Sequence, residues 1–308
     1  MTDDLNPKHG WRRALGLFGL AFATSVAPPG LLVAVPLLVL IGLGGIRSFG
    51  LFVLTVAAMV FAMIGPREGL WYAERGWALM AGGVFAALSL SLPSWRLTSR
   101  SLAAVLATAV AFAILLGLRA DAWATLDWQM GDRLRGGFAT WIDAMQVLRG
   151  GEPVPAATVT AAFTTAEALV AVFPAVLALE SMAALGVAWW IYLRFVHHRG
   201  DGVAPLGGFR FNDHLVWVMI IGLVLVGVRT DEGLTRLGAN LAVFMGALYA
   251  LRGVGVVSFV SGGLSFVRAS MLALGFLFAA PVVIGFAVLL GIADTWLDVR
   301  ERVGAGAA

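Results

Sequence analysis

Cysteine is missing from this chain of 308 residues, and lysine occurs once, at Lys8. Without cysteine the protein can form neither disulfides nor thiolate metal sites, and it has no cysteine nucleophile. Without a lysine beyond the N-terminal segment, a phosphate-binding P-loop and a Schiff-base mechanism both lack the amine that they need. G-x-S-x-G and H-E-x-x-H motifs are also missing. We therefore expect a protein that is not an enzyme and that needs no cofactor.

Charged residues are scarce as well. They make up 13% of the chain, whereas ~25% is typical of soluble domains. Hydrophobic residues make up 60%, and the mean hydropathy is +0.91. The net charge of +3 is small and scattered, so the high pI predicts no nucleic-acid partner. This composition indicates an integral membrane protein that is embedded in a lipid bilayer.

Long apolar runs fill most of the sequence. A helix needs ~20 apolar residues to cross ~30 Å of hydrocarbon. The runs that come closest to this length are Gly76–Leu92, Leu102–Leu118, Ala168–Leu193, Leu215–Val228, Leu237–Val260 and Leu272–Ile292. With the N-terminal helices described next, they predict an all-α integral membrane protein, a polytopic bundle of eight or nine transmembrane helices.

The apolar stretch Ala14–Gly45 is interrupted by Pro28-Pro29-Gly30. Proline removes a backbone donor and clashes with the preceding turn, so one continuous helix would not tolerate this sequence. We expect two short helices joined by a tight turn; the alternative is one span plus a re-entrant piece. A third helix is predicted over Phe49–Ile64, and a fourth and fifth on either side of the Pro93–Arg100 hinge.

One sizeable polar insertion, Arg119–Thr160, separates the two halves of the chain. Apolar residues recur in it at helical spacing, with polar residues between them, which is typical of a helix lying in the membrane interface. Gly136 and Gly137 weaken this pattern, and a helical lid packed on the bundle is the alternative. The apolar residues are Leu134, Phe138, Trp141, Ile142, Met145 and Leu148.

The expected organisation is a single helical membrane domain over residues 1–308 in the bacterial cytoplasmic (inner) membrane. Its parts are a cytoplasmic tail (1–13), N-terminal helices (14–118), the interfacial insertion (119–160), C-terminal helices (161–302) and a disordered tail (303–308). A basic segment contains Arg194, His197, His198, Arg199 and Arg210, whereas aspartates crowd the insertion. This contrast favours a cytoplasmic location for the basic segment.

Glu180 is the first candidate site residue, because it lies within the apolar segment FPAVLALESMAALGVAWW. An ionised carboxylate there would cost at least ~2.5 kcal/mol, so such a group is protonated, paired or facing a cavity. Pro174, in the same segment, can kink the helix and free a backbone carbonyl. Two interpretations stay open: a substrate or proton site, and a buried, hydrogen-bonded carboxyl that holds the bundle together.

Arg252 is the natural counter-charge, since long apolar runs flank it on both sides. Its expected depth differs from that of Glu180 by ~9 Å, which a long arginine can only just cover. It could equally end its helix and extend to the headgroups. Asn240 points to roughly the same helix face as Arg252 and has interhelical hydrogen bonding as its ordinary explanation. We predict that Glu180 and Arg252 are coupled, directly or through a polar group such as Asn240.

Two further groups are weak candidates for metal binding. His197 and His198 are adjacent, so on a helix they point about 100° apart, which favours a solvated helix end over a metal site. Asp294 and Asp298 lie one turn apart and could hold a cation. A solvated helix end with an Asp298–Arg302 pair explains them better. We therefore expect no metal site.

The chain resembles the YybS-like family of predicted bacterial membrane proteins, a domain of unknown function. The resemblance covers roughly Pro174–Arg302 and rests on Phe209-Arg210-Phe211, on Asn240 followed by LYALRGVGVV, and on the closing GIADTWLDVR. The family commonly has glutamine where this chain has Arg252. Through that family the chain is distantly similar to the substrate-binding components of energy-coupling-factor transporters. The resemblance implies docking on an ATPase module through small residues, with which Gly19-x-x-x-Ala23 is compatible.

Together these observations predict a multi-pass membrane protein that binds or transports a small molecule without its own ATPase. The alternative is a structural or assembly subunit that scaffolds a membrane complex through glycine and alanine faces of its helices. A transporter should have a polar-lined cavity that reaches Glu180 or Asn240. A scaffold should have a filled interior and an exposed stripe of small residues.

Overall fold

Eleven α-helices and two short 3₁₀ helices make up the described part of the protein in this computed structural model. The structure describes residues 10–25, 28–44, 49–64, 67, 69–195, 204–228, 231–262 and 266–305. The chain forms two compact units. We call Gly16–Arg199 the N-terminal unit, and Gly200–Ala308 with Met1–Leu15 the C-terminal unit. Whether they act as a single membrane domain stays a prediction, and most of the expected tail 1–13 lies outside the described residues.

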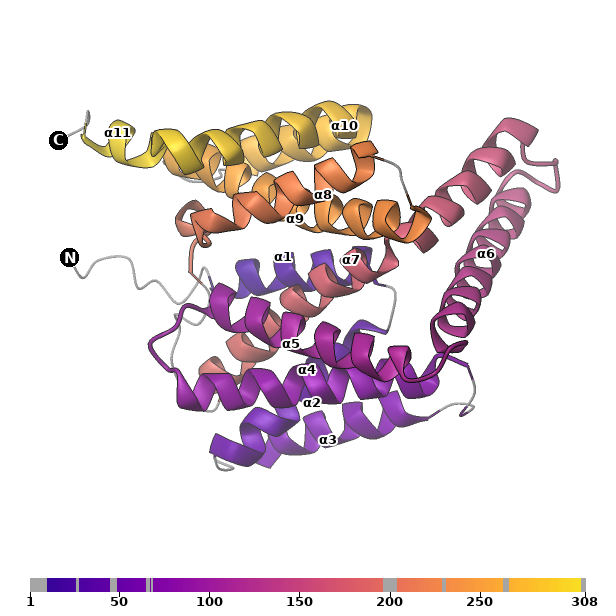
Figure 1. Cartoon of the computed structure of the whole chain (residues 1–308), viewed down its shortest axis with the longest axis horizontal. Coiled ribbons are helices and arrows are strands. Elements are labelled where there is room, and N and C mark those ends of the chain that lie inside the picture. Colours follow the sequence, from indigo (N-terminus) through magenta and orange to yellow (C-terminus); the bar gives the residue numbers. More distant parts are fainter. Residues whose placement is uncertain are drawn as a thin grey trace. The chain divides into compact units, whose positions relative to one another are not determined.

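The helices of the N-terminal unit, shown in Figure 1, begin and end near proline and glycine residues of the sequence. Its helices are α1 (Gly10–Ala23), which belongs to this unit from Gly16 onward, α2 (Pro29–Gly44), α3 (Phe49–Met63), α4 (Trp71–Ser91), α5 (Leu97–Gly117), α6 (Ala122–Leu148) and α7 (Ala156–Phe195). Pro29 is the first residue of α2, a position where its missing N–H breaks no helical bond. The prediction of two short helices around Pro28-Pro29-Gly30 is therefore confirmed.

Helix α2 forms the centre of this unit. Its sequence has no polar face, and a helix that is apolar all round is buried in a protein interior or in a membrane. It packs against α3, α4 and α7, and Leu31, Val35 and Ile41 are almost fully buried. Gly82 of α4 lies directly against Pro36, where a Cβ would come within 3.0 Å of the proline backbone. Such close packing leaves α2 little freedom to move.

Helices α6 and α7 form a long antiparallel pair (Figure 1). The 40 residues of α7 extend about 60 Å, roughly twice the thickness of the hydrocarbon layer. Helix α6 packs along the first half of α7, and Arg135 donates to Glu167 at 2.8 Å across the pair. The predicted helix in the insertion is confirmed and runs through Gly136-Gly137 without a break. Its location in the membrane interface stays a prediction.

The C-terminal unit is built around one long helix, α9, which packs between α8 and α10. Its elements are η1 (Leu206–Gly208), η2 (Asp213–Leu215), α8 (Val216–Val228), α9 (Glu232–Val260), α10 (Phe266–Leu297) and α11 (Val299–Ala305). Because α11 extends to Ala305, the expected disordered tail is helical where it begins. Helix α10 bends at Ala279, where the backbone leaves helical geometry shortly before Pro281.

Glycines let the backbones of this unit come close together. On α8 and α9, Gly222 and Gly238 lie so close that a Cβ on either would meet the backbone of the other helix within 3.0 Å. On α9 and α10, Gly253 faces the Ala287 carbonyl and Gly291 faces the Tyr249 carbonyl. Small residues at helix crossings are the usual means of close packing in membrane bundles.

Four helices are long and apolar enough to cross a membrane. They are Leu97–Gly117, Ala156–Phe195, Glu232–Val260 and Phe278–Leu297. Shorter apolar helices accompany them, at Ala14–Ala23, Pro29–Gly44, Phe52–Met63 and Asp213–Val228. The described residues thus form an all-helical protein with several candidate membrane spans.

The α9–α10 crossing makes a testable prediction. Replacing Gly253 by alanine would drive a methyl group into the Ala287 carbonyl, so we expect a loss of about 1–3 kcal/mol in the free energy of unfolding. Gly246→Ala is the matched control on the same helix, because nothing lies within 4 Å of a Cβ there. That control should gain about 0.4–1 kcal/mol. SDS-induced unfolding in mixed micelles measures both, and equal stability of the two variants would contradict the crossing.

Candidate functional site

The most densely charged buried group lies in the C-terminal unit, around Arg252. This arginine is only 1% exposed, although it lies inside α9. Its Nε donates to Asp294 Oδ2 at 2.9 Å, and its Nη1 donates to Asp213 Oδ1 at 2.6 Å. Its Nη2 donates to the Asp294 carbonyl at 3.3 Å. The interpretation of Arg252 as a helix end that extends to the headgroups is therefore wrong, because acidic partners hold it inside the unit.

A second arginine, Arg300 of α11, approaches the same carboxylate. Arg300 Nη2 lies 3.2 Å from Asp294 Oδ2 and 3.0 Å from the Phe209 carbonyl, while Nη1 donates to the Gly207 carbonyl at 2.7 Å. Burial lowers the pKa of the Arg300 guanidinium, and the Asp294 carboxylate opposes that shift. Arginine nevertheless stays charged at neutral pH. Two buried cations thus surround one buried carboxylate.

Asp294 is fully buried, so its interpretation as part of a solvated helix end is wrong. Arg300, which also donates to the Gly207 and Phe209 carbonyls, binds it, and the sequence spacing alone did not indicate this. Asp298, in contrast, is exposed and has a positive φ of 42°. Among the described ion pairs its partner is Arg210 at 3.5 Å, rather than the expected Arg302.

An aromatic wall completes this cluster. The Arg252 guanidinium lies 5.5 Å from the centre of the Phe211 ring, which packs edge-on against Tyr249 at 5.1 Å. Asp213 is 60% exposed and supplies the second negative charge. A buried ion group is stable only when each charge is paired and hydrogen-bonded. We call Arg252, Arg300, Asp294 and Asp213 the ion cluster; its geometry suits holding α9, α10 and α11 together.

Sequence reasoning missed Asp213 and Arg300 as partners. Both lie beside motifs that carried the family resemblance: Asp213 follows Phe209-Arg210-Phe211, and Arg300 ends GIADTWLDVR. The concentration of charges in these otherwise apolar motifs was the available signal. Asn240 Nδ2 donates to the Arg236 carbonyl of its own helix at 2.9 Å.

Glu180 lies in the N-terminal unit and is fully buried in α7. Its neighbour Ser181 accepts a hydrogen bond from Trp77 Nε1 at 2.8 Å and donates to the Leu177 carbonyl at 2.7 Å. The structure therefore places the carboxyl inside a packed interior. Its pairing with Arg252 would join the two units and stays a prediction, as does its choice between a structural and a proton-handling role.

A second polar group, which the sequence did not predict, joins α4 to α3 and α6. Glu74 binds Arg75 at 2.8 Å and also Arg133 of α6. Arg75 Nη2 donates to the Ala62 carbonyl of α3, and its guanidinium lies 4.7 Å from the Trp71 ring. A cavity of about 590 Å³ adjoins this group.

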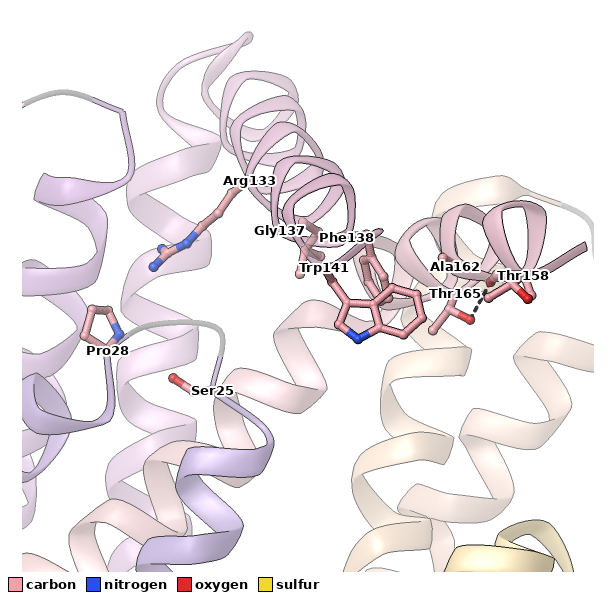
Figure 2. A pocket seen from close by; sticks show the side chains of 11 residues that line it. Ser25, Pro28, Arg133, Gly137, Phe138, Trp141, Thr158, Ala162 and Thr165 are labelled. Carbon is pink, nitrogen blue, oxygen red and sulfur yellow. Dashed lines mark hydrogen bonds between the residues drawn. The ribbon is translucent and has the colours of Figure 1, made fainter. Parts of the chain in front are cut away.

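A larger cavity, of about 620 Å³, lies between the α1–α2 turn, α6 and α7 (Figure 2). Figure 2 shows Phe138 and Trp141 of α6 beside Thr165 of α7. Its full lining is Ser25, Pro28, Arg133, Leu134, Gly137, Phe138, Trp141, Thr158, Ala161, Ala162 and Thr165. Its volume falls within the ~300–1,000 Å³ of small-molecule sites. Neither Glu180 nor Asn240 lines it.

No metal-binding group of three acidic or histidine side chains occurs in the portion of the chain that the structure describes. The adjacent pair His197 and His198 lies outside those residues. The polar side chains described above therefore form ion pairs and hydrogen bonds.

The ion cluster predicts a strong effect of Asp294→Asn. This change leaves Arg252 and Arg300 buried with less than their full counter-charge, so unfolding should become easier by about 3–5 kcal/mol. Asp298→Asn is the matched control, because Asp298 is exposed and asparagine tolerates its positive φ. That variant should change stability by at most about 1 kcal/mol. If both variants unfold at the same SDS fraction, the ion cluster does not stabilise the unit.

The burial of Glu180 makes a separate prediction. Glu180→Gln keeps the shape and a hydrogen-bonding group, so folding should be nearly unaffected. Glu180→Leu removes the polar group and should cost about 1–3 kcal/mol, because its partners lose their hydrogen bonds in a dry interior. The yield and thermal unfolding of both variants in detergent test this; equal behaviour would contradict a hydrogen-bonded carboxyl.

A comparison with known proteins identifies the family of this chain. No curated protein sequence and no solved structure matches the chain. A family model described as "Predicted membrane protein (DUF2232)" matches residues 15–295. The match includes the helices of the N-terminal unit, whereas the resemblance drawn from sequence motifs covered only the last part of the chain. Since most of the chain is matched, the protein belongs to this family of predicted membrane proteins.

Proposed function

We propose that the protein binds a small, largely apolar molecule in the cavity between the α1–α2 turn, α6 and α7. The observation that carries this proposal is the cavity itself, at about 620 Å³ and with a lining of mixed character. Phe138, Trp141 and Leu134 offer an apolar surface, while Ser25 and Thr158 offer hydroxyl groups. Sites for small molecules combine these two features.

The charges that line the cavity restrict the chemical class of its ligand. Arg133 is the charged residue of its lining, and it already binds Glu74. A ligand therefore meets a neutralised ion pair rather than a free cation. An uncharged molecule with an apolar body and one or two hydrogen-bonding groups suits this lining better than a phosphate or a carboxylate.

The location of the cavity supports a role at the membrane surface. Helix α7 is about 60 Å long, so a span of about 30 Å leaves its other half beyond the hydrocarbon. The half that pairs with the charged helix α6 carries the exposed Arg135–Glu167 pair and is the part to protrude. We propose that α6 and this half of α7 lie beyond the hydrocarbon at the surface of a bacterial inner membrane, with eight or nine helices crossing it.

Binding would serve transport without hydrolysis. We propose no catalysis, because neither the sequence motifs nor the described polar groups suggest a nucleophile with its base. An external ATPase module would supply the energy, as in the energy-coupling-factor transporters, to which the YybS-like family is distantly similar. Glu180 does not line this cavity.

The second candidate function is a scaffold for a membrane complex. The observation that favours it is on α1, where Gly19 and Ala23 are exposed and nothing lies within 4 Å of a Cβ built at Gly19. Such a surface would accept another helix closely. A scaffold would keep its partner when the cavity is filled, whereas a binding protein would lose its ligand.

Filling the cavity tests the proposal. Gly137 lines it and has no atom within 4 Å of a Cβ, so Gly137→Phe should occupy the space without distorting α6. Gly136→Phe is the matched control, because that position has equal room but does not line the cavity. Mass spectrometry of extracts from gently purified protein should find an apolar molecule with the wild type and with Gly136→Phe. Gly137→Phe should retain about tenfold less.

Equal recovery from both variants would exclude this cavity as the binding site. Recovery of a protein partner from all three preparations, with no small molecule from any, would favour the scaffold.

A further inference from the structure

Arg100 is a buried arginine for which the described residues provide no acidic partner. It lies in the first turn of α5, on one of the candidate membrane spans, and is only 6% exposed. Its guanidinium lies 4.5 Å from the centre of the Trp189 ring of α7. Its Nε has no hydrogen-bond acceptor among the described residues. Arg252, buried to a similar degree, has two carboxylates.

Further donors without partners accompany it. Helix α5 begins without a side-chain cap, so the amide groups of its first turn lack that partner. A guanidinium and a helix N-terminus both stabilise negative charge.

The surrounding end of the unit is basic. Because Arg100 contacts Trp189, the start of α5 lies beside the end of α7, where Arg194 is 5.7 Å from the Trp190 ring. Arg96 precedes α5 at the same end and is exposed. The sequence has no acidic residue between Arg75 and Arg119. An anion that approaches this end therefore meets positive charge and no acidic side chain from this stretch of the sequence.

We propose that the Arg100 guanidinium and the first turn of α5 bind a phosphate group. Phosphate fits because it brings the acceptor oxygens that this site lacks and can accept two parallel hydrogen bonds from one guanidinium. Trp189 holds the planar group from its other side. The first turn of a membrane span lies near the headgroup level, so an anionic phospholipid and free inorganic phosphate are the two sources of this chemistry. The site is separate from the cavity lined by Trp141.

Full-length protein in mild detergent tests the proposal. Native mass spectrometry, after addition of equal phosphatidylglycerol and phosphatidylcholine, measures lipid retention. Thermal unfolding in inorganic phosphate and in chloride, at matched ionic strength, measures binding of the free ion. Arg100→Gln should reduce the retained phosphatidylglycerol or the affinity for phosphate about tenfold or more. Arg119→Gln, the same change at the exposed far end of α5, should leave both as in the wild type.

Each outcome decides the matter. Loss of phosphatidylglycerol in Arg100→Gln alone identifies a lipid headgroup site, and loss of phosphate stabilisation alone identifies a site for the free ion. Arg100→Lys, which keeps the charge but not the paired donors, should weaken the same ligand severalfold and serves if Arg100→Gln does not fold. A wild-type protein that prefers neither phosphatidylglycerol over phosphatidylcholine nor phosphate over chloride overturns the proposal. So does equal behaviour of Arg100→Gln and Arg119→Gln.

Discussion

The pairing of Arg252 with Asp294 is the interaction on which the C-terminal unit depends. In an apolar interior an unpaired charge costs several kcal/mol. Asp294 binds both Arg252 of α9 and Arg300 of α11, and it belongs to α10 itself. One carboxylate therefore links three helices, and the helices cannot separate without removing that counter-charge from two buried cations.

Glycines make this pairing geometrically possible. Gly253 follows Arg252, and Gly291 lies one turn before Asp294, so the closest approach of α9 and α10 coincides with the buried charges. A larger residue at either position would push the helices apart and lengthen the ion pair. Packing and electrostatics thus depend on the same few positions, which also explains why a methyl group at Gly253 and an amide at Asp294 should both destabilise the unit.

The arginines at the two ends of the N-terminal unit have different partners. Near α6, Glu74 neutralises Arg133 beside an apolar cavity, which suits an uncharged ligand. Near the start of α5, Arg100 lies on an aromatic ring without a carboxylate, which suits an anion. Arginine therefore favours an uncharged ligand at one end and an anion at the other, because its partners differ.

Much of the helix layout could be predicted from the sequence, because apolar runs and proline breaks act locally: α1 and α2 separate at Pro28-Pro29-Gly30, and α6 follows its apolar spacing. That Glu180 and Arg252 are exceptional charges was equally visible in their apolar flanks. The partners were not. Arg252 binds Asp213 and Asp294, which lie 39 and 42 residues away, and only packing decides which of several distant carboxylates arrives. Burial of Asp294 likewise depends on Arg300 folding over it, a contact between helices that no periodicity within one helix encodes.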